Sequence, residues 1–339
     1  MRRTIPSFIY VFLLITGLTL PCLAQEKTYK VEVLQITAIE ELQQVYDGFL
    51  KELEKSGLIQ GKNLEVRRTI IDFDLENPTL TKRINVYFRI KSEASRIIKE
   101  KPDLVLTMGT PATRYSKDKI IAAGIPLEFT ALAFPTAVGC KSLTEAGPGF
   151  TGATTHMDMK DALKVVRLAF PAIKTLGIVN SDDLNSISHA EEAKKEGPPQ
   201  GFTVISKKVG MKDNIVPALI ELQKQGAQAF VVPPDPYYEI RNHEKAGELI
   251  EFSKTNKIPA FSFVIDRVPG AILYVGVDFG VIGALSGQQA VKILKDGVKP
   301  GSLPIVRQQN LTVLVDMNLV QAMGIQLPPE VLHIAKPLD

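Results

Sequence analysis

The feature that most constrains the fold is a repeated alternation of short apolar strands with amphipathic helices. Residues 30–37 form a β-branched run, and residues 40–55 then place apolar side chains at helical spacing. The same order returns from residue 175 onward. The expected strands are 30–37, 64–71, 104–108 and 125–131 in the first half, and 175–180, 202–207, 229–232 and 258–264 in the second. Only residues 72–94 break the match, and they predict a surface insertion or an extended helix.

Alternating strands and helices predict parallel sheets with right-handed crossovers, and two tandem units predict two similar lobes. The expected fold class is therefore α/β, with two doubly wound parallel-sheet lobes joined by a multi-strand hinge. Ligands of such sheets bind beyond the carboxyl ends of the strands, here in a cleft between lobes. Chain crossings are expected near 147–155, 274–278 and 310–313. The expected lobes are residues 28–148 with 276–310, and residues 149–275 with 311–339.

The N-terminus has the layout of a secretory signal peptide. Arg2 and Arg3 precede an uncharged stretch, residues 8–20, which is shorter than the roughly 20 residues that span a bilayer. Cleavage after Ala24 is expected, so residues 1–24 are removed and the protein acts in the periplasm or another extracytoplasmic space. The alternatives are a membrane anchor and a lipid on Cys22, although Pro21 stands where lipoprotein signals usually have a small residue.

Charge and cysteine content exclude several classes of protein. The net charge of +3 includes the two arginines of the signal. The mature chain is therefore close to neutral and has no excess of positive charge that would attract nucleic acid. Cys140 is the one cysteine outside the signal, which excludes an intramolecular disulfide or a cysteine-based metal site. The histidines are widely spaced, at positions 156, 189, 243 and 333. We therefore expect no metal and no cofactor.

Catalytic motifs are also missing from the sequence. Residues 147–152 match the glycine pattern of dinucleotide sites, but they follow a polar loop instead of a strand, and we assign them to the first chain crossing. No P-loop, H-E-x-x-H, C-x-x-C or G-x-S-x-G pattern occurs. The sequence predicts no catalytic residue.

The chain resembles the ABC transporter substrate-binding proteins of the tryptophan/tyrosine-type group, which have the type I periplasmic-binding fold. The resemblance runs from residue 31 to residue 327. Its motifs are GLIQGKNLEV (57–66), KPDLVLTMGTPAT (101–113), GFTGATT (149–155), FPAIKTLGIVNSDDLNS (170–186), AFVVPPD (229–235) and GVDFGVIGALSGQQAVKILKDGVKPGSLP (276–304). The resemblance implies that the turns at Thr110-Pro111 and Asp235 border the ligand, as do Asn185-Ser186 and Asp278. The chain departs from the family pattern at residues 133–135 and 237–238.

Elementary chemistry gives these positions roles. Thr110 and Pro111 lie where a strand passes into a helix, so free N–H groups and the helix dipole suit a carboxylate. Asp235 and Asp278 suit an ammonium group. The alternative is that Thr110 and Asp235 only cap their own helices. Aromatic residues add stacking surface; the complete set of ligand-binding candidates is Thr37, Thr110, Pro111, Phe134, Asn185, Ser186, Asp235, Tyr237 and Asp278.

The leading hypothesis is an exported, monomeric solute-binding protein. It captures a small zwitterionic ligand, such as an aromatic or other amino acid, and delivers it to an ABC permease and its ATPase by closing its lobes. It contacts the membrane only through the permease or a lipid anchor. A ligand-sensing module of a signalling system and an exported enzyme on the same fold are the alternatives.

Overall fold

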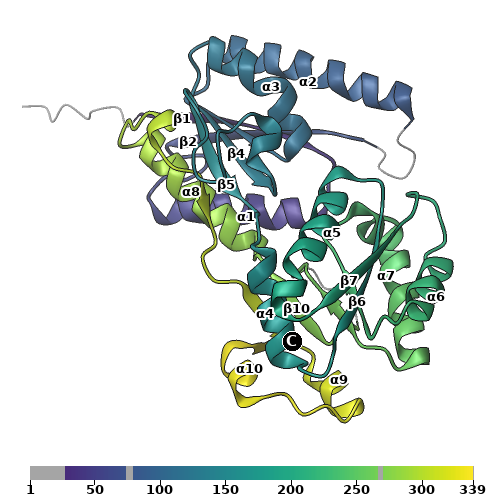
Figure 1. Cartoon of the computed structure of the whole chain (residues 1–339). Helices are drawn as coiled ribbons and strands as arrows, with labels where there is room; N and C mark the ends of the chain where they lie inside the picture. The colour runs from purple at the N-terminus through teal and green to yellow at the C-terminus, as the bar shows by residue number, and fades with distance from the viewer. Residues whose placement is uncertain (1–26, 74–78, 266–269, 339) are drawn as a thin grey trace, which may run out of the picture.

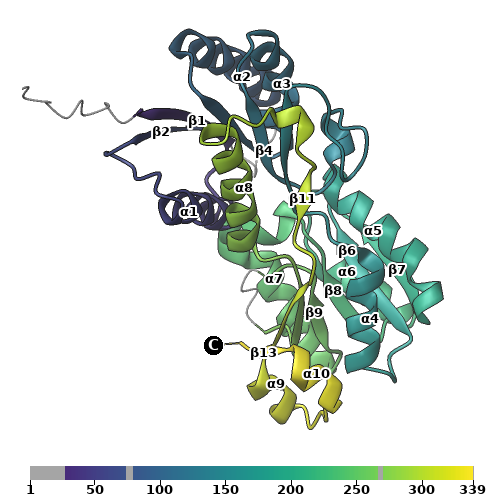
Figure 2. The same cartoon turned by 90° about the vertical axis from the view of Figure 1, so that its left-hand side faces the viewer.

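The chain builds two separate sheets, each covered by helices on both faces (Figures 1 and 2). The computed structural model describes residues 27–73, 79–265 and 270–338. The expected signal peptide lies outside these residues. Within them, no helix combines the length and the apolar character needed to cross a membrane.

The first sheet has the strand order β11-β5-β4-β3-β1-β2, and all its pairings are parallel. Its strands are β1 (Tyr29–Ile36), β2 (Leu64–Ile71), β3 (Leu104–Met108), β4 (Leu127–Leu132), β5 (Phe150–Thr154) and β11 (Val306–Arg307). Its helices are α1 (Glu40–Lys55), α2 (Leu80–Glu100), α3 (Thr110–Ala122) and α8 (Phe279–Leu294). Along β1, Val31 and Val33 belong to one core cluster while Leu34 belongs to another, which is the period-two alternation of a strand buried on both faces.

The second sheet has the order β13-β12-β10-β9-β8-β6-β7. Its strands are β6 (Thr175–Asn180), β7 (Thr203–Lys208), β8 (Ala229–Val232), β9 (Ala260–Ser262), β10 (Leu273–Gly276), β12 (Thr312–Val315) and β13 (Lys336–Pro337). The pair β10–β12 is antiparallel and the others are parallel. Helices α4 (Met159–Ala169), α5 (Leu184–Glu196), α6 (Val216–Lys224) and α7 (Pro236–Asn256) cover it, and α9 (Met317–Ala322) and α10 (Pro329–Ile334) follow β12. The predicted fold class is confirmed, with this one antiparallel pair as an addition.

Three chain segments connect the two sheets. The chain passes from β5 to α4, from β10 back to α8, and from β11 to β12. Strand β5 pairs with β4, so residues 150–154 lie in the first sheet and the chain leaves it only after Thr154. This differs from the expected lobe boundary between residues 148 and 149, because the glycine- and threonine-rich segment forms a strand between β4 and β11 before the chain crosses.

The extra residues of the first half form a helix. Helix α2 begins at Leu80, and its first residue with a fully buried side chain is Ile90. Residues 80–94 therefore match the extended-helix alternative, while residues 74–78 of the segment lie outside the described part of the chain.

Candidate ligand-binding site

A small cavity lies where the ends of strands from both sheets meet the chain crossings. Its volume is about 50 Å³. The residues that line it come from both lobes and from two crossings: Ala133, Thr155, Met157, His189, Pro234, Phe263, Val264, Val277 and Phe279. Seven of these nine side chains are apolar, so this interlobe cavity offers an apolar surface with His189 and Thr155 as its polar groups.

His189, which lines the cavity, and the buried His156 both pack against the ring of Phe134. The ring of Phe134 lies 5.5 Å from that of His189 and 5.8 Å from that of His156, centroid to centroid. His189 is 2% exposed and His156 is 7% exposed, and the Nδ1 atom of each has no hydrogen-bond partner. Burial lowers the pKa of both imidazoles, that of His189 to about 4. At neutral pH both rings are therefore uncharged.

The burial of His189 predicts a loss of stability in acid. Its pKa rises from about 4 in the folded state to the ordinary value of about 6.5 in the unfolded chain, so stability is complete above pH 6.5 and falls as the pH drops toward 4. Between pH 7.5 and pH 5 this group should lower the free energy of unfolding by about 2 kcal/mol. Urea unfolding of wild type and His189→Leu at both pH values measures the difference.

The control for this experiment is His333→Leu, at an exposed position on α10. We expect it to keep the wild-type dependence of stability on pH, while His189→Leu loses about 2 kcal/mol of that dependence. If His189→Leu and His333→Leu respond alike, His189 does not control acid stability.

In the first lobe, the predicted site residues lie at the carboxyl ends of strands. Thr37 follows β1 and is half-buried, with φ of +70°, a value that is uncommon for threonine. Ala131, in β4, also has a positive φ of +58°. Gly109, with φ of +86°, is the N-cap of α3, so Thr110 is the first residue inside the helix and its side chain is not the cap. Thr110 is half-buried and Pro111 exposed.

In the second lobe, Asp235 and Ser186 are hydrogen-bonded to each other, and neither residue lines the interlobe cavity. The Asp235 carboxylate accepts hydrogen bonds from the Ser181 N–H (2.7 Å), the Ser181 hydroxyl (2.8 Å), the Tyr237 N–H (3.0 Å) and the Ser186 hydroxyl. Asp235 is 1% exposed and Ser186 is fully buried. In this structure the carboxylate caps α7 and joins it to the start of α5, so it is not available to an ammonium group.

Tyr237 belongs to the core of the second lobe. It is fully buried, and its hydroxyl donates to the backbone oxygen of Asp213 at 2.8 Å. Burial raises the pKa of this phenol above its ordinary value. The side chain therefore contributes packing, in contrast to the ligand contact expected from the sequence.

Asp278 and Asn185 are half-buried at helix starts on the two sides of the site. The Asp278 carboxylate caps α8 by accepting from the Val281 N–H at 3.0 Å. Its own N–H donates to Gln308 Oε1 at 2.8 Å, which joins the second crossing to the third. Asn185 lies in the first turn of α5.

The structure adds site residues that sequence reasoning missed. Ala133, Pro234 and Val277 line the cavity, and each directly precedes a predicted residue, namely Phe134, Asp235 and Asp278. The sequence thus located the segments but not the side chains that face the cavity. His189, Met157 and Phe263 had no sequence signal at all, because they are single residues within ordinary helix and loop patterns. Among the described residues, no group of three or more His, Cys, Asp or Glu side chains could hold a metal ion.

Two doubly wound lobes, three connecting segments and a cavity between the lobes define a type I periplasmic-binding-protein-like clamp. A profile of the family described as "ABC transporter substrate binding protein" matches residues 30–338. The chain therefore belongs to this family, whose members bind a small molecule outside the cytoplasm, work with an ABC transporter and are not enzymes. The family match favours a transport role over the two alternatives, a sensing module and an exported enzyme.

Individual relatives have low sequence identity but cover most of the chain. The "Tyrosine-binding protein" of Clostridioides difficile (strain R20291) is 22% identical over 306 residues, which are 89% of this chain and 82% of that protein. A conserved domain protein from Vibrio cholerae has a TM-score of 0.72 at 23% identity, over 92% of this chain and 100% of that one. An ABC domain from Streptococcus pneumonia in complex with L-Trp has a TM-score of 0.71 at 21% identity, with the same coverage.

Proposed function

We propose that this protein captures an amino acid with an aromatic side chain in its interlobe cleft and passes it to an ABC permease and its ATPase. Two relatives named above bind tyrosine or contain L-Trp. The observation that carries the proposal is the apolar interlobe cavity, where Phe263, Phe279 and Met157 supply surface for a ring. Extracytoplasmic action as a monomer, after cleavage at Ala24, is part of the proposal.

The two ends of a zwitterion have matching groups in the first lobe. The first turn of α3 offers the backbone N–H of Thr110 and a positive dipole end to the ligand carboxylate, while Pro111, which has no N–H, fixes the start of the helix. The half-buried carboxylate of Asp278 is the proposed partner of the ammonium group. Thr37, Phe134 and Asn185 remain proposed contacts around the ligand.

Lobe closure is the proposed mechanism. A cavity of about 50 Å³ has room for one or two water molecules, whereas pockets for small ligands measure about 300–1,000 Å³. Ligand capture therefore requires the lobes to separate at the three crossings and close again. The ring would contact Phe263 and His189 of the second lobe while the zwitterion binds the first, so the ligand stabilises the closed arrangement that the permease recognises.

Thermal unfolding of the ligand-stripped mature protein tests this function. L-tyrosine, L-tryptophan or L-phenylalanine at 100 times its Kd should stabilise the protein by about 2.7 kcal/mol, which raises the Tm by a few degrees. Leucine, sugars and nucleosides should give no shift at the same concentrations. A shift with sugars or nucleosides alone would overturn the amino-acid assignment while leaving the fold intact.

Asp278→Ala should weaken the amino-acid affinity at least about tenfold, because a hydrogen bond to a charged group is worth about 1.5–3 kcal/mol. Asp316→Ala is the matched control: Asp316 caps α9 by accepting from the Leu319 N–H at 3.0 Å, and it lies outside the lining of the cavity. Each substitution should cost about 1 kcal/mol of stability as a lost cap. Calorimetric titration separates the two, and equal affinities would remove Asp278 from the site.

A further inference from the structure

The first turns of α2 carry apolar side chains that stay partly or largely exposed in the described part of the chain. Leu80 is 74% exposed, Ile84 45%, Tyr87 38% and Phe88 62%. Leu80, Ile84 and Phe88 follow one another at a spacing of four residues, which places them along one side of the helix. We call these four residues the α2 stripe. Figure 1 shows α2 along the outside of the first lobe.

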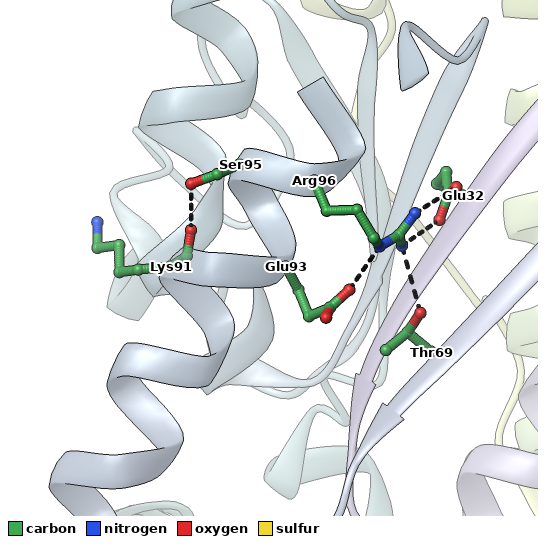
Figure 3. A network of polar contacts seen from close by, with 6 residues as sticks. All are labelled: Glu32, Thr69, Lys91, Glu93, Ser95 and Arg96. Carbon is green, nitrogen blue, oxygen red and sulfur yellow. Dashed lines mark hydrogen bonds and ion pairs between the residues drawn. The ribbon is translucent and has the colours of Figure 1, made fainter. Parts of the chain in front are cut away.

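The other half of α2 is firmly attached to the first sheet (Figure 3). Arg96 donates to both carboxylate oxygens of Glu32 at 2.9 and 2.7 Å, and also to Glu93 and to the Thr69 hydroxyl. The side chains of Ile90, Ala94 and Ile97 are fully buried. The helix is therefore held from its C-terminal half, and the stripe projects from a rigid base.

Few internal contacts support the projecting half. The Tyr87 ring packs edge-on against Tyr115 of α3 at 5.1 Å, and the Thr79 hydroxyl caps the helix by accepting from the Lys82 N–H at 3.3 Å. A helical segment this short is marginal in water on its own. Four clustered apolar side chains on such a segment are typical of a surface that binds a partner.

The charge of the same segment indicates the chemistry of that partner. Residues 79–92 include Lys82, Arg83, Arg89 and Lys91 but no acidic residue. Arg83 and Arg89 are exposed. The first acidic residue of the helix, Glu93, forms an ion pair with Arg96 at 2.7 Å. A helix segment with apolar side chains and only positive charge is complementary to an anionic phospholipid surface, into which the apolar groups insert while the basic groups contact the headgroups.

In contrast to the membrane contact through the permease or a lipid anchor alone that the sequence predicts, we propose that the α2 stripe docks the first lobe directly onto an anionic phospholipid membrane surface. Such docking would hold the protein beside the membrane in which a permease resides, with or without ligand in the cleft. The contact is weak and reversible, because it uses four apolar side chains and a few charges, far less than a membrane-spanning helix.

Vesicle co-sedimentation of the mature protein tests the proposal. Vesicles of phosphatidylglycerol and phosphatidylcholine should bind the protein at least about tenfold more tightly than vesicles of phosphatidylcholine alone, and high salt should abolish the difference. The variant Leu80→Ser/Ile84→Ser/Phe88→Ser should lose at least about tenfold in binding. Arg83→Gln/Arg89→Gln should lose about fivefold for each charge on anionic vesicles only.

The matched control replaces three apolar residues of similar exposure in the second lobe. Met323, Leu332 and Ile334, near α9 and on α10, are 41%, 49% and 47% exposed, and their change to serine should leave vesicle binding unchanged. Circular dichroism and the Tm verify that both triple variants fold. The proposal is overturned if the protein does not bind anionic vesicles or binds neutral vesicles equally well. It is also overturned if the control variant loses as much vesicle binding as the stripe variant. A stripe variant that loses amino-acid affinity or permease binding but not vesicle binding also overturns it, in favour of a protein contact.

Discussion

Gly283→Ala is expected to destabilise the protein by about 3 kcal/mol or more. Helices α1 and α8 lie side by side in Figure 2, and at this crossing their backbones touch. A Cβ atom on Gly283 would lie 2.0 Å from the backbone oxygen of Val45 and 2.9 Å from the Phe49 nitrogen. Backbone atoms of two helices cannot move aside as a flexible side chain can, so the helices must separate and lose packing.

The control for this substitution is Gly247→Ala in α7, where a Cβ atom would meet nothing within 4 Å. It should be neutral or stabilise the protein by up to about 1 kcal/mol, since alanine favours the helix. Urea unfolding of both variants gives the comparison. Helix α8 begins beside the cavity at Phe279, so a folded Gly283→Ala protein should also bind its ligand more weakly. Equal stability of the two variants would contradict the close helix contact.

Asp235→Ala should lower the free energy of unfolding by about 3–5 kcal/mol. The substitution leaves the Ser181 N–H, the Tyr237 N–H and two serine hydroxyls without their buried acceptor. Each unsatisfied buried group costs about 1–3 kcal/mol, and relaxation or entering water recovers part of the sum. Asp235→Asn should cost less, because its amide oxygen still accepts some of these bonds.

This second prediction also distinguishes a structural role of Asp235 from the ligand role that the sequence had indicated. Asp316→Ala, the loss of a half-buried cap on α9, should cost only about 1 kcal/mol and serves as the comparison in the same unfolding experiment. A normal Tm together with lost amino-acid binding in Asp235→Ala would restore the ligand role and reject the capping network as the main function of this carboxylate.

Local patterns were enough to place most of the elements. The strands at 64–71, 104–108, 175–180 and 229–232 and the helix at 40–55 have the bounds expected from the sequence. They could be located because apolar residues recur at every second position in a strand and about every 3.6 positions in a helix. The sequence left open whether residues 72–94 form a surface insertion or an extended helix, and the structure begins the helix at Leu80.

The candidate site shows where local patterns stop being informative. A sequence indicates that Asp235 precedes a helix, but only the fold shows that Ser181 and Ser186 of another helix start converge on its carboxylate. Tyr237 is aromatic beside a turn in the sequence and fully buried in the core in the structure. His189 became a site residue because the packing of α5 brings it to the same cavity as Ala133 of the other lobe.

The sequence by itself determined the two-lobed α/β fold, the family and the segments that border the cleft. Only the tertiary structure decided which side chains in those segments face the cavity, how closely α1 and α8 approach, and that the α2 stripe stays exposed. The physical reason is that periodicity records burial relative to a residue's own helix or strand. The direction of a side chain at the end of an element depends instead on contacts between elements far apart in the chain.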